Sequence, residues 1–121
     1  MEIKEVTTRK DLSEFIHLPW KIYRDDPNWV PPLISDMKFR LDARKNPFFE
    51  HGEAQSFLAK ENGESLGRIT AIIDRKHNEF HKERVGFFGF FESLRRYEVA
   101  EALFDKARGW CKARGMTVLR G

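Results

Sequence analysis

Hydrophobic and polar positions follow two different periods along this chain, and these periods divide it into strands and helices. Alternating or continuously apolar segments predict strands at residues 2–6, 53–60, 65–74, 85–92 and, from about Met116, 117–119. Apolar positions spaced three or four apart predict helices at residues 10–23, from 32 to before 45, and 97–114. The predicted order is therefore strand, two helices, three strands, helix, strand.

The connections between these elements predict how the strands pair. Asn62-Gly63 is the strongest short hairpin signal, because both residues tolerate positive φ. The polar segment 75–84 is predicted to be a solvated link, so the three consecutive strands should be antiparallel. The helix at 97–114 should form a right-handed crossover, which places the last strand parallel to the fourth. The predicted fold class is α+β with a mixed five-stranded sheet.

Three positions near the first two helices carry signals of their own. Thr8 is a predicted N-cap, with Asp11 three residues later in place of the usual glutamate. Pro19 removes a backbone donor inside the first helix, so we expect either a kink or two short helices joined there. Pro32 is expected at the first position of the second helix.

The segment Val85–Glu92 is a strand dominated by phenylalanine and glycine. The two-residue period predicts that Phe88 and Phe90 share one face, opposite residues 87, 89 and 91. Neither face is solvated, so the strand should lie inside the sheet. Gly86 and Gly89 indicate either a β-bulge or places where a ligand approaches the backbone closely.

Composition and charge exclude several classes of protein. The chain has 121 residues and a hydrophobic fraction of 40%, which fits one globular domain. Its 22 basic residues are interleaved with 19 acidic ones, so we expect a mixed solvated surface and no nucleic-acid partner. No apolar run approaches the roughly 20 residues that span a bilayer, and the start lacks signal-peptide features, which predicts a cytoplasmic protein without a membrane partner.

Cysteine and histidine offer little chemistry in this sequence. Cys111 is the single cysteine, which excludes an internal disulfide, and it is predicted to be a small core or boundary residue. His77 and His81 are four residues apart, but Glu79 is one place off the zincin pattern His-Glu-x-x-His, and no helix is indicated there. We therefore expect no metal site, even with His51 added.

Four segments carry a resemblance to a known superfamily. They are residues 18–23 (LPWKIY), 26–32 (DPNWVPP), 45–52 (KNPFFEHG) and 86–92 (GFFGFFE). These segments and the element order resemble the amino-terminal half of the GNAT fold, the acyl-CoA-dependent N-acetyltransferases, and a group of bacterial GNAT-like proteins of largely unassigned substrate. The resemblance covers essentially the whole chain. It implies a β-α-α-β-β-β-α-β half-domain, with residues 1–121 forming a single amino-terminal domain truncated after the fifth strand.

The resemblance also implies a cofactor, acetyl-CoA or another acyl-CoA, in a cleft where the fourth and fifth strands splay apart. Its pantetheine arm would follow the fourth strand and its pyrophosphate would meet the next helix, whose amides and dipole favour anions. The implied cofactor-binding residues are Phe90, Phe91, Ser93, Arg95 and Arg96. The superfamily's glycine-containing phosphate loop is absent here, and Glu98 would oppose an anion that the two arginines attract.

Acyl transfer to an amine needs a base for the ammonium proton and an acid for the leaving thiolate. The implied base is Glu92, at the carboxyl end of the fourth strand, and the implied acid is Tyr97, with Tyr23 as the alternative. A structural interpretation of Glu92 is also open, in which it caps the following helix or neutralises Arg95.

An acceptor pocket is the functional interpretation of Trp29, Phe48 and Phe49, because aromatic residues beside rigid turns often form binding surfaces. The structural interpretation places Trp29 in the core at a stiff corner and leaves Phe48 and Phe49 in a loop.

These observations predict an acyl-CoA-dependent N-acetyltransferase-like domain, incomplete or inactive alone, whose acceptor is an unidentified small-molecule amine. The alternative is a non-catalytic binding or assembly module that keeps the fold without the cofactor. Open strand edges recruit partners, so we also expect a homo-oligomer through the last strand, unless a missing carboxyl-terminal half covers it.

Overall fold

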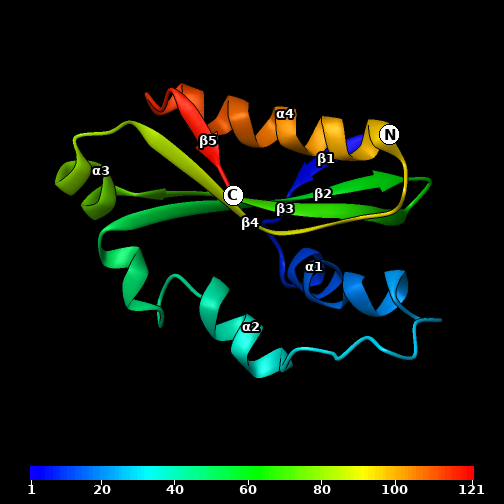
Figure 1. The fold of residues 1–121 in the computed structure, drawn as a ribbon. Coiled ribbons are helices and arrows are strands. Elements are labelled where there is room, and N and C mark those ends of the chain that lie inside the picture. Colours follow the sequence, from blue (N-terminus) through cyan, green and yellow to red (C-terminus); the bar gives the residue numbers. More distant parts are fainter.

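A computed structural model describes residues 1–121 as one mixed sheet with helices on both sides (Figure 1). The strands are β1 (Glu2–Glu5), β2 (Gly52–Glu61), β3 (Glu64–Asp74), β4 (Val85–Ser93) and β5 (Val118–Arg120). The helices are α1 (Arg9–Ile22), α2 (Ile34–Leu41), the 3₁₀ helix η1 (Pro47–Glu50), α3 (Arg75–His81) and α4 (Tyr97–Ala113). Helix α4 covers one face of the sheet, and α1 and α2 lie on the opposite side (Figure 1). The predicted α+β class is confirmed.

The strands are arranged in the order β1-β2-β3-β4-β5. The pairs β1–β2, β2–β3 and β3–β4 are antiparallel, whereas β4 and β5 are parallel, with Val85 opposite Val118 and Phe87 opposite Arg120. The β2–β3 turn has φ values of 51° at Asn62 and 81° at Gly63, as predicted. Val118 is 48% exposed, and the homo-oligomer through this strand stays a prediction.

The core between the sheet and α4 follows the predicted apolar face of that helix. Its helical members are Val99, Leu103, Ala107 and Cys111, all of which are buried. Burial raises the pKa of the Cys111 thiol, which favours the protonated form and agrees with a packing role. No helix of the chain combines the length and apolar character that crossing a bilayer requires.

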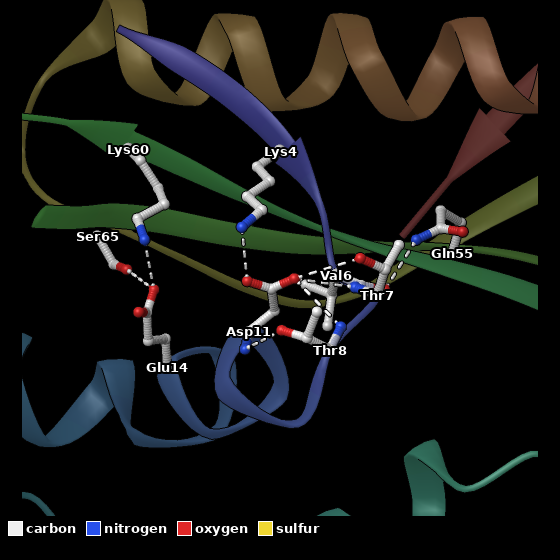
Figure 2. A network of polar contacts seen from close by, with 9 residues as sticks. All are labelled: Lys4, Val6, Thr7, Thr8, Asp11, Glu14, Gln55, Lys60 and Ser65. Atoms are coloured by element: carbon white, nitrogen blue, oxygen red, sulfur yellow. Dashed lines mark hydrogen bonds and ion pairs between the residues drawn. The ribbon is translucent and has the colours of Figure 1, made fainter. Parts of the chain in front are cut away.

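Helix α1 begins with a capping box that also anchors it to β1 (Figure 2). The Asp11 amide donates to the Thr8 hydroxyl at 3.0 Å, and the Asp11 carboxylate accepts from the amides of Thr7 and Thr8. Lys4 of β1 places its Nζ 2.9 Å from the same carboxylate. The pKa of Asp11 lies well below its usual value. The hydrogen bond from Lys4 is the largest cause, and the bond from the Thr7 amide is the second. The predicted N-cap is confirmed.

One of the two alternatives at Pro19 and the predicted start of the second helix are wrong. Helix α1 runs through Pro19 without dividing into two, and Arg68 of β3 donates to the Phe15 carbonyl that Pro19 leaves without a helical donor; a kink at Pro19 stays a prediction. Helix α2 begins at Ile34, and Pro32 lies outside it, directly before the extended N-cap Leu33.

Two predicted irregular segments are short helices. Phe48 and Phe49 lie in η1, where the Asn46 side chain accepts from the Phe48 amide at 3.0 Å. The predicted solvated link after β3 contains α3, because Asp74 caps its first turn by accepting from the His77 amide at 3.1 Å.

The predicted alternation of faces fails in the second half of β4. Residues Thr70 and Gly89 are paired, and so are Arg68 and Glu92, so one residue of β3 opposes two of β4. Phe90 occupies this bulge with a φ of +55°. After the bulge, Phe91 joins Phe88 against Phe104 of α4, whereas Phe90 faces Phe15 of α1.

The same geometry shows what Gly86 and Gly89 mark. A β-bulge is present, as one of the two interpretations predicted, and it begins directly after Gly89, at Phe90; Gly86 is not part of it. A Cβ atom at Gly86 would lie 2.5 Å from the Cys111 Sγ, so this glycine allows α4 to approach β4 closely.

Candidate functional site

A hydrogen-bonded carboxylate lies near the carboxyl end of β4. The Tyr23 hydroxyl donates to Glu92 Oε2 at 2.6 Å, across 69 residues of sequence. Tyr23 is the C-cap of α1, and its amide donates to the Pro19 carbonyl at 2.8 Å, which fixes the tyrosine at the helix end. The hydrogen bond to Glu92 is the main cause that raises the pKa of Tyr23, and burial is the second. The phenol therefore stays protonated and acts as the donor.

An aromatic cluster extends from Tyr23 through Trp29 to Trp20. The Trp29 ring stacks on Tyr23 with a centroid separation of 5.4 Å, and it meets Trp20 edge-on at 5.3 Å. Trp29 is half-buried, so it is neither a fully enclosed core residue nor a free surface residue. It belongs to the Tyr23–Glu92 end of the molecule.

Arg68 is a buried cation next to this pair. It is 4% exposed, it is the strand partner of Glu92, and its guanidinium carbon lies 4.9 Å from the centroid of the Phe15 ring. Burial lowers the pKa of Arg68 to about 10, and the negative charge of Glu92 acts in the opposite direction. Arg68 therefore remains charged at neutral pH.

An apolar cavity of about 210 Å³ lies between the sheet, α2 and η1. Its wall includes Phe48, Phe49, Phe90, Ile72, Leu41 and Arg40. The Arg40 guanidinium carbon lies 5.2 Å from the centroid of the Phe90 ring, which places one cation at a wall whose other polar residues are Asn46 and Thr70. The predicted pocket residues are thus divided, because Phe48 and Phe49 line this cavity and Trp29 does not.

The predicted phosphate site at the start of α4 is largely neutralised. Arg96 forms ion pairs with Glu98 at 2.7 Å and with Glu61 at 3.0 Å. The Ser93 hydroxyl donates to the Leu94 carbonyl at 2.8 Å, and Arg95 is exposed. Of the predicted cofactor residues, Arg95 therefore presents its charge to solvent, whereas Arg96 is paired with Glu61 at the end of β2.

The two predicted catalytic residues are bonded to different partners. Tyr97 is 78% exposed, and a hydrogen bond to Glu101 of its own helix raises its pKa. Glu92 is bonded by Tyr23, the alternative acid. The structural interpretation of Glu92 as a helix cap is wrong, because the N-cap of α4 is Arg96 and has no side-chain capping bond.

The histidines form no metal centre in this structure. His77 and His81 have ring centroids 4.4 Å apart on α3, and His77 Nε2 lies 3.1 Å from Glu83. His51 faces Asp74 instead, with 3.8 Å between Nε2 and the carboxylate oxygen. No group of three or more histidine, cysteine or acidic side chains could hold an ion.

Sequence reasoning missed two residues of this region, Arg68 and Arg40. Arg68 did have a signal, because it is the single basic residue inside the apolar run GRITAII of β3. A charge in such a run must find partners when it is buried. Arg40 had none, since its neighbour Phe90 is 50 residues away and turns toward it only at the bulge.

Comparison with solved structures identifies the fold. A tandem GNAT protein from the clavulanic acid biosynthesis pathway matches 98% of this chain with a TM-score of 0.72, at 16% identity and over 35% of its own length. An aminoglycoside 6′-N-acetyltransferase of Acinetobacter haemolyticus matches 99% of the chain with a TM-score of 0.71, at 21% identity and over 77% of its length. The chain has the GNAT fold. A third GNAT-fold neighbour, a predicted acetyltransferase of Clostridium acetobutylicum described with acetyl-CoA, matches 98% of the chain and 77% of its own length, with a TM-score of 0.65 and 15% identity.

Two curated proteins are similar in sequence. Protein YghO of Escherichia coli is 38% identical over 119 residues, which are 98% of this chain and 30% of that protein. A bacterial ceramide synthase of Caulobacter vibrioides is 37% identical over 118 residues, which are 97% of this chain and 31% of that protein. The chain thus spans about 30% of the length of these relatives. No protein-family model matches it.

Proposed function

We propose that this GNAT-fold chain is part of an N-acyltransferase that moves an acyl group from acyl-CoA to an amine. The observation that carries the proposal is the Tyr23–Glu92 pair, with 2.6 Å between its oxygens, near the carboxyl end of β4. Because β4 and β5 are parallel strands joined by α4, this end of β4 is where α/β units bind ligands.

The proposed chemistry assigns Glu92 as the base. Glu92 takes a proton from the substrate ammonium, directly or through one water, and Tyr23 holds the carboxylate in place. The amine electron pair forms the new C–N bond, the C–S bond of the thioester breaks, and CoA leaves as a thiolate that takes up a proton from a general acid. The nitrogen gives up its second proton as the amide forms, and this proton restores the acid. We propose Tyr97 as that acid, because its phenol is exposed at the first residue of α4, beside the proposed cofactor contacts. The products are an amide and free CoA.

The proposed cofactor contacts follow β4 into the start of α4. Phe90, Phe91 and Ser93 lie on the strand, and Arg95 is exposed beside the helix amino terminus, where an anion is favoured. Arg96 would first have to leave Glu61 and Glu98. For this reason we infer that the chain alone binds acyl-CoA weakly, and that further protein completes the site.

The proposed acceptor is an amine with a long aliphatic chain. The apolar cavity beside Phe90 suits an alkyl group better than a sugar, because most of its wall is aromatic or aliphatic. The similarity to a bacterial ceramide synthase supports the same substrate class, since a ceramide is the amide of a fatty acid with a long-chain amino alcohol.

The alternative function, a non-catalytic assembly module, is favoured by one observation. The acidic partners of Arg96 already neutralise the charge that a CoA phosphate would meet. A module of this kind would keep the fold and would not bind the cofactor.

Two assays separate the two functions, and both use a protein of the relatives' length that contains residues 1–121. Binding is measured by calorimetric titration of this protein with acetyl-CoA and with palmitoyl-CoA. Turnover is measured as release of free CoA thiol, with sphinganine or ethanolamine as the acceptor. We expect binding of acyl-CoA, faster release with sphinganine, and at least a 100-fold loss of kcat in Glu92→Gln. The control Glu79→Gln removes an exposed carboxylate from α3 and should keep full activity. Absence of acyl-CoA binding would favour the assembly module, and equal activity of both variants would exclude Glu92 as the base.

A further inference from the structure

We propose that Arg68 is a positioning residue that joins α1 to the bulge in β4, through the helix carbonyl that Pro19 leaves free, and thereby places Glu92 beside Tyr23. This proposal rests on the function proposed above, because its kinetic consequence requires acyl transfer. Its structural consequence can be measured without turnover.

The first arm of Arg68 meets α1. In an α-helix the carbonyl of residue 15 accepts a bond from the amide of residue 19, but Pro19 has no amide hydrogen. Phe15 is fully buried, so water does not replace that donor. Arg68 donates from one terminal nitrogen to this carbonyl at 2.7 Å. Pro19 thus leaves the Phe15 carbonyl without its helical donor, and Arg68 supplies a donor in its place.

The second arm of Arg68 meets the bulge. Its Nε donates to the Phe90 carbonyl at 2.8 Å. Phe90 has a φ of +55°, a backbone conformation that bulky residues rarely adopt and that must be held by its surroundings. The Phe15 ring packs edge-on against Phe90 at 6.4 Å, so both arms end at residues that also contact each other. Arg68 therefore ties the strained residue to the helix carbonyl.

The bulge decides where Glu92 lies. The extra residue shifts the register so that Glu92 pairs with Arg68 itself. The Tyr23 amide bonds to the Pro19 carbonyl, so the tyrosine that meets Glu92 is held by the same proline. The charged groups facing Arg68 and Tyr23 at this end include Glu92, whose charge attracts the buried guanidinium. Loss of the link should therefore move Glu92 relative to Tyr23.

The planar fork of arginine is what allows both bonds at once. A lysine at position 68 would keep the positive charge but could not reach two carbonyls in fixed directions. Alanine at position 19 would restore an amide that competes with Arg68 for the Phe15 carbonyl, and it would also raise helix propensity. Pro19→Ala is accordingly a variant that should fold well and still disturb the site.

The experiment compares Pro19→Ala, Arg68→Lys, the double variant and the control Arg108→Lys, which changes an exposed arginine of α4. For Pro19→Ala we expect an unchanged or higher Tm, at least a 10-fold lower kcat in CoA release, and a KM for acyl-CoA within about twofold of the parent. The double variant should lose less activity than the product of the single losses, because both changes break one link. A purely structural role would lower Tm and leave the kcat of the folded protein unchanged.

The amide resonances of residues 90–92 give a second readout that does not need activity. They should shift in Pro19→Ala and in Arg68→Lys and should stay in place in the control. An active parent whose Pro19→Ala variant keeps full kcat would overturn the positioning role. An inactive parent would instead count against the proposed function, and unshifted resonances in that protein would overturn the Arg68 link as well.

Discussion

A methyl group added at Gly86 should force α4 away from β4. The Cβ of an alanine there would lie 2.5 Å from the Cys111 Sγ and 3.0 Å from the Cys111 Cβ. Both residues are buried, so neither side can yield into solvent. Overpacking of a closed site costs roughly 1–3 kcal/mol. We expect Gly86→Ala to lower the free energy of unfolding by about 2 kcal/mol, in the middle of that range.

A second substitution shows whether Cys111 is the cause. Cys111→Ala removes the sulfur and leaves a small cavity, which costs on the order of 1 kcal/mol by itself. In the double variant the nearest remaining atom is the β-carbon of residue 111, so most of the clash is relieved. The double variant should therefore be more stable than the sum of the single effects predicts, by about 1–2 kcal/mol.

Urea unfolding followed by tryptophan fluorescence measures these differences. The control is Gly109→Ala, an exposed position of the same helix where a Cβ meets no atom within 4 Å, and it should stabilise the protein by about 0.5–1 kcal/mol. Two results would refute the close packing of α4 on β4. One is that the single effects are additive, and the other is that Gly86→Ala is as stable as the parent.

Three further predictions test other parts of the structure. Tyr23→Phe removes the 2.6 Å bond to Glu92, so acyl transfer should fall about 10-fold while stability changes by roughly 1 kcal/mol or less; activity equal to that of the parent would contradict this. Gly63→Ala places an alanine at a φ of +81° and should cost roughly 1–2 kcal/mol in urea unfolding; an unchanged midpoint would contradict the turn. The pKa of Asp11 is lowered on folding, so its contribution to stability is present above its usual value of 3.8 and is lost as the pH falls toward the folded value. The Tm difference between the parent and Asp11→Asn should therefore shrink from about pH 6 to about pH 3, and a constant difference would show that this carboxylate is not linked to folding (Figure 2).

The order of elements was predictable because it depends on local signals. Asn62-Gly63 has a backbone preference that one turn type satisfies, and a strand that follows a helical crossover such as α4 runs parallel to the strand before it, as β5 does. Thr8 and Asp11 lie within one helical turn, so their capping box needs no tertiary information. Each of these predictions rests on residues that are close in sequence.

The site was less predictable because it depends on contacts between distant residues. Gly89 indicated a bulge in β4 but not its position at Phe90, and the bulge reverses the faces of the residues that follow. The pair Tyr23–Glu92 joins the end of α1 to β4, whereas the sequence placed Tyr97 first and left Tyr23 as the alternative. Helix α3 was missed since it is only seven residues long, all but Phe80 are polar, and its cap, Asp74, is also the last residue of a strand.

The central claim is that the carboxyl end of β4, with Glu92 and the start of α4, receives acyl-CoA. Amide chemical-shift mapping of residues 1–121 during titration with palmitoyl-CoA tests it most directly. The account predicts that the largest shifts fall on residues 90–98, with smaller ones at Tyr23 and Trp29. Shifts confined to β1 and β2, or none at saturating ligand, would contradict it.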